Sequence, residues 1–323
     1  MAENSLKECL AFNPEKARAE IVDFIRSQIR RFNKKGTMIG LSGGLDSSTV
    51  AFLCVEALGK EKVMGLILPE RDTTPKNTED GIDLAEKLGI PYKKIDISPI
   101  LEGLGAYTLF PKEVTSSRSA MEEAVDRMKR MTGKQSAFAE SFSSIYTPGG
   151  AQEDHYVGRM HAFMTAKTRA RMMTIYFHAI IMDYLVVGTD DLSELTIGFY
   201  DKYGDGACDI SILSHLFKTQ IKALAAHIGV PEHIVNKPSS HDLWGEGMPN
   251  EETIGLPYEK LDMVLCGLME GLWEADIADM AGVRLDDIVA VKKSIASERV
   301  RRSMPISVNI EPQAAEEEQL MKR

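Results

Sequence analysis

Apolar and polar residues follow two different periods along this chain, and together the periods predict strands that alternate with helices. Short apolar runs predict buried strands at residues 37–41, 63–68, 92–97 and 183–188. Apolar positions three and four residues apart predict helices at residues 14–32, 48–58, 78–88, 169–182 and 213–228. This alternation is typical of right-handed βαβ units, so we expect an α/β fold with a doubly wound parallel sheet flanked by helices.

A long polar segment at residues 103–158 interrupts this rhythm. It contains one amphipathic stretch, in which Met121, Val125, Met128 and Met131 would share a helix face. The simpler interpretation of that stretch is an ordinary packing helix, and the alternative is a lid or a dimer contact.

Residues 258–302 predict a helical C-terminal extension. Neither this extension nor the polar segment changes in composition as an independent domain would. We therefore expect a single domain over residues 1–310, with an insert at about 103–158. Residues 311–323 would form an acidic, flexible tail.

The composition limits the classes of partner. The chain has 323 residues, of which 44% are hydrophobic, and its 48 acidic residues exceed its 38 basic ones, for a net charge of −10. A nucleic-acid partner is disfavoured, because phosphate neutralisation favours an excess of Lys and Arg. No run approaches the ~20 apolar residues that span a bilayer, and no signal peptide is visible, so we expect a cytoplasmic protein.

Four cysteines are present, Cys9, Cys54, Cys208 and Cys266, and none belongs to a CxxC pair. Disulfide frameworks are typical of small secreted chains, so we expect these thiols to be reduced. The seven histidines show no spacing typical of metal ligands.

The most specific motif is Ser-Gly-Gly-Leu-Asp-Ser at residues 42–47, between a predicted strand and a predicted helix. A helix N-terminus offers unpaired N–H groups and the positive end of its dipole to an anion. Gly43 and Gly44 let the backbone approach phosphate oxygens closely. Asp46 would repel phosphate directly but could hold a Mg²⁺ ion that bridges to it.

This loop resembles the PP-loop of the ATP pyrophosphatase superfamily. The resemblance implies an adenine nucleotide alpha-hydrolase-like fold and cleavage of ATP between its α- and β-phosphates, with the loop holding the pyrophosphate. It does not by itself define the molecule that is adenylated.

A second group of carboxylates follows the strand predicted at 183–188. Gly188, Thr189 and Asp190 come first, and Glu194 could complete the Mg²⁺ shell begun by Asp46. Ligands bind at the carboxyl ends of strands in open parallel sheets, which supports this pairing. Turn or capping roles are the simpler interpretation of the remaining acidic residues in this region, Asp190, Asp191, Asp201 and Asp205.

Five further features make the chain similar to ammonia-dependent NAD synthetases, from about residue 19 to residue 305. The family has a GTD…E motif, a GFxxKYGDGxxD segment and a downstream helical lysine. These appear here at 188–194, at 198–209 and at Lys218. Segments in the style of KP[ST]xxDL and GLxYExLD appear at 237–243 and 255–262.

The resemblance implies a role for individual residues. Asp46 and Lys218 would be catalytic, and Asp46 and Glu194 would bind Mg²⁺. The ATP-binding residues would be Gly40, Leu41, Ser42, Gly43, Gly44, Leu45, Asp46, Ser47, Thr189, Lys218 and Ser240. The residues that contact nicotinic acid adenine dinucleotide (deamido-NAD) would be Arg169, Lys202, Asp209 and Arg301.

Two segments depart from the family pattern. The family has N-x-x-A-R-x-R-M where this chain has Thr165 in place of the asparagine and Thr168 in place of the alanine. It has H-K-R-x-x-P where this chain has Val300, Arg301 and Arg302 at the first three positions. Both segments are associated with the deamido-NAD side of the site.

The resemblance therefore implies an enzyme that uses ATP and Mg²⁺ to amidate deamido-NAD with ammonia through an acyl-adenylate, giving NAD, AMP and pyrophosphate. A homodimer is expected, with ammonia taken from solution or from a separate partner. The alternatives are a PP-loop enzyme that adenylates a different carboxylate or a tRNA base, and a silent nucleotide-binding module. No CxxC supports tRNA thiolation, and Asp46 and Glu194 are both present, which disfavours a silent module.

Overall fold

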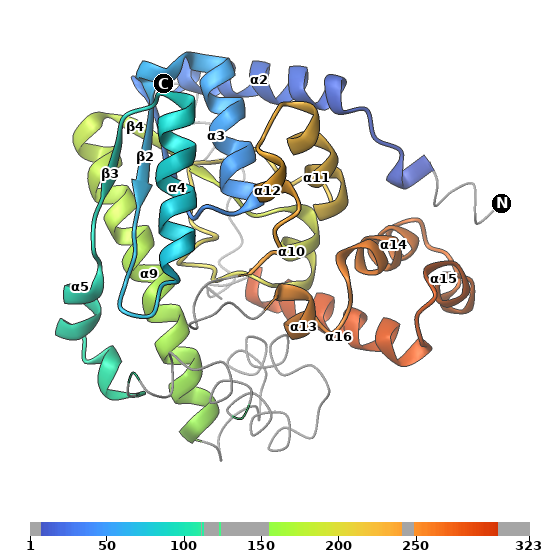
Figure 1. Cartoon of the computed structure of the whole chain (residues 1–323). Coiled ribbons are helices and arrows are strands. Elements are labelled where there is room, and N and C mark those ends of the chain that lie inside the picture. The colour runs from blue at the N-terminus through green and yellow to red at the C-terminus, as the bar shows by residue number, and fades with distance from the viewer. Residues whose placement is uncertain (1–7, 111, 113–122, 124–154, 241–248, 303–323) are drawn as a thin grey trace, which may run out of the picture.

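The structure contains the parallel sheet that the sequence predicts. In this computed structural model, residues 8–110, 112, 123, 155–240 and 249–302 are described. They include a five-stranded sheet of order β3-β2-β1-β4-β5, and each neighbouring pair is parallel (Figure 1). The strands are β1 (Gly36–Gly40), β2 (Val63–Ile67), β3 (Tyr92–Lys94), β4 (Tyr184–Gly188) and β5 (Ile210–Ser211).

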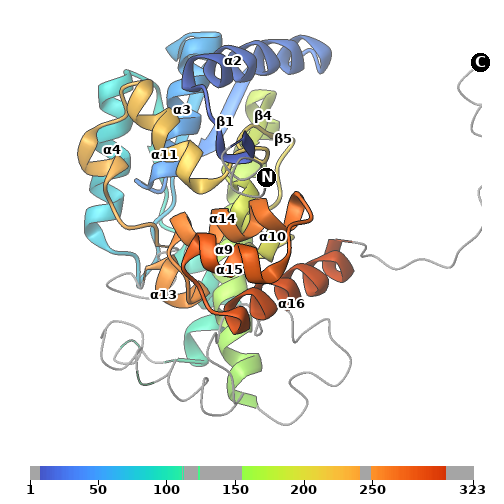
Figure 2. The same ribbon diagram turned by 90° about the vertical axis from the view of Figure 1, so that its right-hand side faces the viewer.

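Helices connect and cover these strands. Those that precede or pack near the sheet are α2 (Pro14–Arg31), α3 (Leu45–Leu58), α4 (Pro75–Leu88), α5 (Ser98–Gly103), α9 (His155–Met182), α10 (Leu192–Ile197), α11 (Lys218–His227) and α12 (Glu232–Val235). The C-terminal part of the described chain contains α13 (Asn250–Ile254), α14 (Tyr258–Met269), α15 (Glu274–Ala281) and α16 (Leu285–Arg302). These last helices lie to one side of the sheet, as Figures 1 and 2 show, and they confirm the predicted helical extension.

Local signals in the sequence explain where helices begin and end. The side chain of Asn13 caps α2 by accepting a 3.0 Å hydrogen bond from the Lys16 N–H, and Pro14 occupies the first turn, where no N–H is needed. Helix α4 likewise starts with a proline, Pro75, and it ends at Gly89, whose φ of 66° is left-handed.

The sheet has a separate hydrophobic core on each face. Because side chains alternate along a strand, Ile39 and Val187 lie in one cluster with residues from α2, α3, α4 and α11. Met38 and Val186 lie in the other cluster, together with residues from α9 and α14. Helices therefore cover both faces, and the predicted doubly wound architecture is confirmed.

Several predicted boundaries are wrong. Helix α9 begins at His155 rather than at 169, so the end of the predicted insert is helical. The helix buries three polar residues, Thr165, Lys167 and Thr168. They interrupt the apolar spacing on which the sequence-based prediction depended. Helix α11 begins at Lys218 rather than at 213, and β3 ends at Lys94 rather than at 97.

The prediction of four reduced cysteines is also wrong. The structure joins Cys9 to Cys266 of α14 in a disulfide, with Cα atoms 6.2 Å apart, while Cys54 and Cys208 are free. The two partners are 257 residues apart in sequence, so only the packing of the N-terminal segment near α14 brings them together. The amphipathic stretch at 121–131 and the tail at 311–323 lie outside the described residues.

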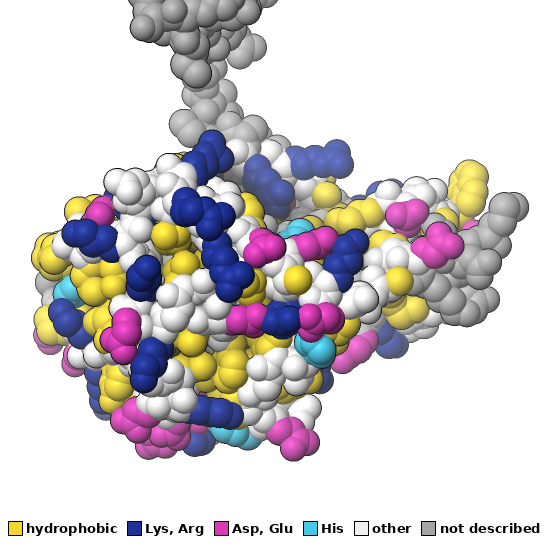
Figure 3. Space-filling view, turned by 90° about the horizontal axis from the view of Figure 1, so that it is seen from above, with side chains coloured by type: hydrophobic (Ala, Val, Ile, Leu, Met, Phe, Trp, Pro, Cys, Tyr) yellow, Lys and Arg dark blue, Asp and Glu magenta, His cyan; other side chains and the backbone are white. Residues whose placement is uncertain are grey.

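The surface carries mixed charge. On the face in Figure 3, basic and acidic side chains are interspersed with hydrophobic ones, which is ordinary for a solvated surface. Among the helices of the described ranges, none has the length and apolar character needed to cross a bilayer.

Candidate active site

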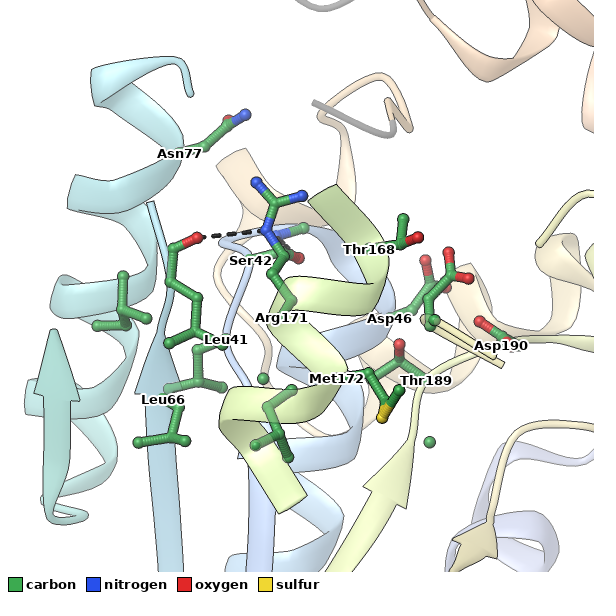
Figure 4. Close-up of a pocket in the computed structure, with 18 of the residues that line it drawn as sticks. Leu41, Ser42, Asp46, Leu66, Asn77, Thr168, Arg171, Met172, Thr189 and Asp190 are labelled. Atoms are coloured by element: carbon green, nitrogen blue, oxygen red, sulfur yellow. Dashed lines mark hydrogen bonds between the residues drawn. The ribbon is translucent and has the colours of Figure 1, made fainter. Parts of the chain in front are cut away.

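A cavity of about 280 Å³ opens at the carboxyl ends of the central strands. Its walls come from the segments that follow β1, β2 and β4, from one face of α9, and from residues 237–240. In Figure 4, Asp46 and Asp190 lie on one side of this cavity, Leu41, Leu66 and Asn77 lie on the other, and Arg171 reaches in between them. This is where a doubly wound sheet binds its ligand, beside the strand at which the order reverses.

The loop after β1 is held in a fixed shape by its own side chains. The Ser42 and Ser47 hydroxyls lie 3.0 Å apart, and the Ser48 hydroxyl donates to the Gly44 carbonyl at 2.7 Å. Gly43 has a φ of 73°, and a Cβ there would lie 2.4 Å from the Asn77 carbonyl oxygen, so only glycine fits against α4. The first turn of α3, including Asp46, lines the cavity and brings the positive end of a helix dipole to it.

Lys218 joins the carboxylates that the sequence assigns to the metal site. Its Nζ lies 2.9 Å from Asp46 Oδ2, 2.9 Å from Glu194 Oε1 and 2.7 Å from Asp191 Oδ2. Tyr258 covers the ammonium with its ring at 5.1 Å, and its hydroxyl donates to Glu194 Oε1 at 3.2 Å. We call Lys218, Asp46, Asp191 and Glu194 the Lys218 cluster.

The Lys218 cluster holds more negative than positive charge. Burial disfavours the ammonium, but Asp191, Asp46 and Glu194 outweigh it and raise the pKa of Lys218 well above its ordinary value. Burial and the neighbouring Asp191 raise the pKa of Glu194 to about 8. Burial likewise raises the pKa of Asp191 to about 6, against the opposing effect of Lys218. A further cation would therefore be bound favourably here.

Two more carboxylates line the same cavity. Burial, with the Asp205 carboxylate, raises the pKa of Asp190 well above its ordinary value. Burial raises the pKa of Asp205 itself to about 7, and Asp201 and Glu194 add to this. Asp205 therefore lies in the pKa range in which a carboxylate exchanges protons at neutral pH, and the pKa of Asp190 is shifted in the same direction.

The residues of the Lys218 cluster fit a Mg²⁺ ion that also binds phosphate. Asp46 Oδ1 is buried without a hydrogen-bond partner, so a ligating oxygen is already desolvated. Within the described chain there is no group of three or more His, Cys, Asp or Glu side chains arranged around a single metal position. Magnesium commonly takes one or two protein carboxylates and completes its shell with substrate phosphates and water, which matches Asp46 and Glu194.

Of the four residues expected to contact deamido-NAD, three do not line the cavity: Arg169, Lys202 and Asp209. Arg169 donates to Asp201 Oδ1 at 3.1 Å near the rim. Asp209 accepts from the Val186 N–H at 2.8 Å and from the Tyr176 hydroxyl at 3.3 Å, so it also anchors β4. Lys202 lies 5.4 Å from the Tyr203 ring centroid, and Arg301 belongs to α16.

Most of the residues expected to contact ATP do line the cavity. They are Gly40, Leu41, Ser42, Gly44, Leu45, Asp46, Thr189 and Ser240, and the metal candidate Glu194 joins them. The other three do not line the cavity themselves but contact residues that do, as described above: Gly43, Ser47 and Lys218.

Two residues near the loop, Lys237 and Arg171, were not assigned a role by the sequence reasoning. Lys237 donates to the Gly43 carbonyl at 3.2 Å and to Asn77 Oδ1 at 2.6 Å, and so ties the loop to α4. Arg171 bonds only neutral groups, the Leu68 carbonyl at 3.2 Å and the Thr73 hydroxyl at 3.4 Å, which leaves its charge available to the cavity. Lys237 and Arg171 both belong to segments that resemble family motifs, and this membership could have identified them as site residues from the sequence.

The family model and two relatives that match this chain are NAD synthases or NAD synthetases. The family model described as NAD synthase matches residues 17–163 and 108–305. The chain is 39% identical over 269 residues to the NH(3)-dependent NAD(+) synthetase of Coprothermobacter proteolyticus, covering 83% of this chain and 90% of that relative. It is 38% identical over 288 residues to the same enzyme of Thermotoga neapolitana, covering 89% and 94%.

Solved structures share the fold. An NMN synthetase from Francisella tularensis superposes with a TM-score of 0.68 at 24% identity, covering 93% of this chain and all 100% of its own. An NH3-dependent NAD synthetase from Campylobacter jejuni superposes with a TM-score of 0.64, also at 24% identity, covering 92% and 100%.

Proposed function

The chain belongs to the NAD synthase family, and we propose that it catalyses the ATP-dependent amidation of deamido-NAD by ammonia, giving NAD, AMP and pyrophosphate. The observation that carries this proposal is the Lys218 cluster, which sets a surplus of buried carboxylates beside a loop shaped for phosphate. A nucleotide triphosphate with its divalent cation is the ligand that satisfies both features.

The first half of the reaction forms an acyl-adenylate. The deamido-NAD carboxylate attacks the α-phosphorus of ATP, and the bond to the pyrophosphate oxygen breaks. The loop at residues 42–47 and the N-terminus of α3 would hold the departing pyrophosphate. Lys218 would stabilise the growing negative charge on the phosphates, and it contacts both proposed Mg²⁺ ligands, Asp46 and Glu194.

Magnesium would be held by Asp46, through its unpartnered Oδ1, and by Glu194. When bound, the ion supplies charge neutralisation to the phosphates. Asp191 would take no direct part, since it already caps α10 by accepting from the Glu194 N–H at 2.7 Å.

In the second half, ammonia attacks the acyl carbon and AMP leaves. An ammonium ion has to lose a proton first. Asp190 and Asp205 are buried carboxylates in the cavity wall, and burial raises the pKa of both, that of Asp205 to about 7. They would therefore bind the ammonium ion and accept its proton.

We also propose that the enzyme is a single-domain homodimer in the cytoplasm. Helix α9 exposes an apolar stripe at Met173, Phe177, Ile180 and Ile181, each with more than half of its surface accessible. The spacing of 4, 3 and 1 residues puts all four on one helix face. A second copy packed against this stripe would cover it, as a C2 interface requires.

The test is a product assay with purified protein, ATP, Mg²⁺, ammonium and deamido-NAD. We expect NAD, AMP and pyrophosphate in equal amounts, with none formed when ammonium or deamido-NAD is left out. Pyrophosphate release with a different carboxylate, or with tRNA, in place of deamido-NAD would overturn the assigned acceptor. Size-exclusion chromatography with light scattering tests the dimer, for which Ile180→Glu should give a monomer.

A further inference from the structure

Asp201 connects a residue that lines the cavity, Thr168, to one that does not, Arg169. It is buried, and its two oxygens are used by two consecutive residues of α9. The Thr168 hydroxyl donates to Oδ2 at 2.7 Å, and Arg169 Nη2 donates to Oδ1 at 3.1 Å. A buried carboxylate that is held from both sides in this way has a fixed orientation.

The backbone of Asp201 also holds the loop that contains Lys202 and Asp205. The Asp201 N–H donates to Asp205 Oδ1 at 2.6 Å, and the Asp201 carbonyl accepts from the Gly204 N–H at 2.9 Å. Thr168 also packs tightly on this loop, because a Cβ at Gly204 would lie 2.5 Å from the Thr168 hydroxyl oxygen. The loop and α9 are therefore in contact through one threonine and one aspartate.

Most of the hydrogen-bond donors of Arg169 are available to a ligand. Its side chain is 44% exposed, and in the described part of the chain Asp201 is the acceptor it contacts, through a single nitrogen. A guanidinium has five donors, so the remaining ones can grip an anionic group in two places. The hydrogen bond to Asp201 fixes the orientation of the Arg169 side chain. Without that bond, an arginine side chain of this exposure would sample many rotamers.

We infer that Thr168 and Asp201 are a positioning pair for the acceptor, which aim Arg169 at an anionic group of the dinucleotide and fix the Lys202 loop beside it. The inference rests on the proposed function for the identity of the acceptor. Thr168 stands where the family motif has alanine, so this chain supplies a hydroxyl that the motif lacks. Thr168 also lines the cavity, but its side chain and that of Asp201 make no hydrogen bond with the loop at 42–47 among the described residues, so we assign the pair to the acceptor and not to ATP.

The experiment compares steady-state constants of the full-length enzyme and its variants. Thr168→Ala introduces the residue of the family motif, and Asp201→Asn keeps an oxygen for Thr168 while it removes the charge that faces Arg169. We expect KM for deamido-NAD to rise about threefold for Thr168→Ala and about tenfold for Asp201→Asn, with KM for ATP unchanged. Thr168→Ser should restore the wild-type value, because it keeps the hydroxyl.

Thr174→Ala is the matched control, because Thr174 is also a buried threonine of α9 but its hydroxyl donates to the Ala170 carbonyl of its own helix. It should leave both KM values unchanged. The inference is overturned if Thr168→Ala and Asp201→Asn leave KM for deamido-NAD within twofold of wild type, or if they raise KM for ATP equally. Wild-type enzyme that forms no NAD would instead overturn the proposed function.

Discussion

Two buried lysines of this molecule are each bound by carboxylates, yet only one of them lies at the cavity. Lys218 contacts Asp46, Asp191 and Glu194 beside the phosphate loop. Lys167 of α9 has no exposed side-chain surface and contacts Glu70 and Asp72 at 2.9 Å each. We call the latter group, together with Arg71, the Lys167 cluster.

The two clusters differ in charge balance. Among the described residues of the Lys167 cluster, Arg71 Nε donates to Asp72 Oδ1 at 2.9 Å, so two cations contact two carboxylates. The Tyr107 hydroxyl completes it by donating to Glu70 Oε2 at 2.9 Å. The Lys218 cluster has three carboxylates for one cation. In the Lys167 cluster the described cations and carboxylates are equal in number, whereas the surplus of carboxylates in the Lys218 cluster marks a place for a further cation.

The largest expected effect is on catalysis, and it comes from the unbalanced cluster. Lys218→Met should lower kcat by about a thousandfold, because the charge that stabilises the transferring phosphates is removed. Lys222→Met is the control, since Lys222 lies on the exposed side of the same helix. A kcat for Lys218→Met within tenfold of the wild-type value would remove Lys218 from the catalytic group.

The balanced cluster should respond in stability instead. Lys167→Met leaves Glu70 and Asp72 buried with one cation between them, so unfolding in urea should show a loss of about 3–5 kcal/mol. Lys16→Met, which removes an exposed pair with Glu20, should cost less than about 1 kcal/mol. Equal losses for the two variants would show that the Lys167 cluster contributes no more than a surface pair.

A smaller effect is expected from pH, and it has opposite signs for stability and for metal binding. The pKa of Glu194 is raised to about 8 in the folded protein, so the folded state binds the proton more tightly than the unfolded state does. Stability without metal should therefore rise as pH falls from 9 toward 6. Mg²⁺ needs the ionised carboxylate, so its affinity should fall by up to about tenfold per pH unit over the same range.

Calorimetric titration of Mg²⁺ in the presence of ATP, at several pH values, measures the second effect. Glu194→Gln should abolish most of the pH dependence. If the affinity of this variant kept the wild-type slope, another group would be responsible for the proton.

The contrast also explains what the sequence could reveal. The loop at 42–47 and the helix that follows it are contiguous, so periodicity and glycine placement predict both, and the parallel sheet follows from the alternation. Asp46, Glu194 and Lys218 are distant in sequence, and only the resemblance to family motifs joined them. The structure places carboxylate oxygens of Asp46 and Glu194 each 2.9 Å from Lys218 Nζ.

The Lys167 cluster could not be predicted from sequence periodicity or from family motifs. Nothing local indicates that Lys167 is buried, because its partners are about a hundred residues away and its charge suggests an exposed position. For the same reason α9 was expected to begin at 169. Asp191 was interpreted as a cap, which it is, but its contact with Lys218 needs the three-dimensional fold.

The central claim is that the surplus of charge in the Lys218 cluster marks the cation site. Its most direct test is thermal unfolding of wild type, Glu194→Gln and Glu70→Gln, each with and without Mg²⁺ and ATP. We predict that Glu194→Gln has an unchanged or higher Tm without ligand and loses the Mg²⁺-dependent increase. Glu70→Gln should have a lower Tm but keep the increase. A wild-type increase in Glu194→Gln, or its loss in Glu70→Gln, would contradict the account.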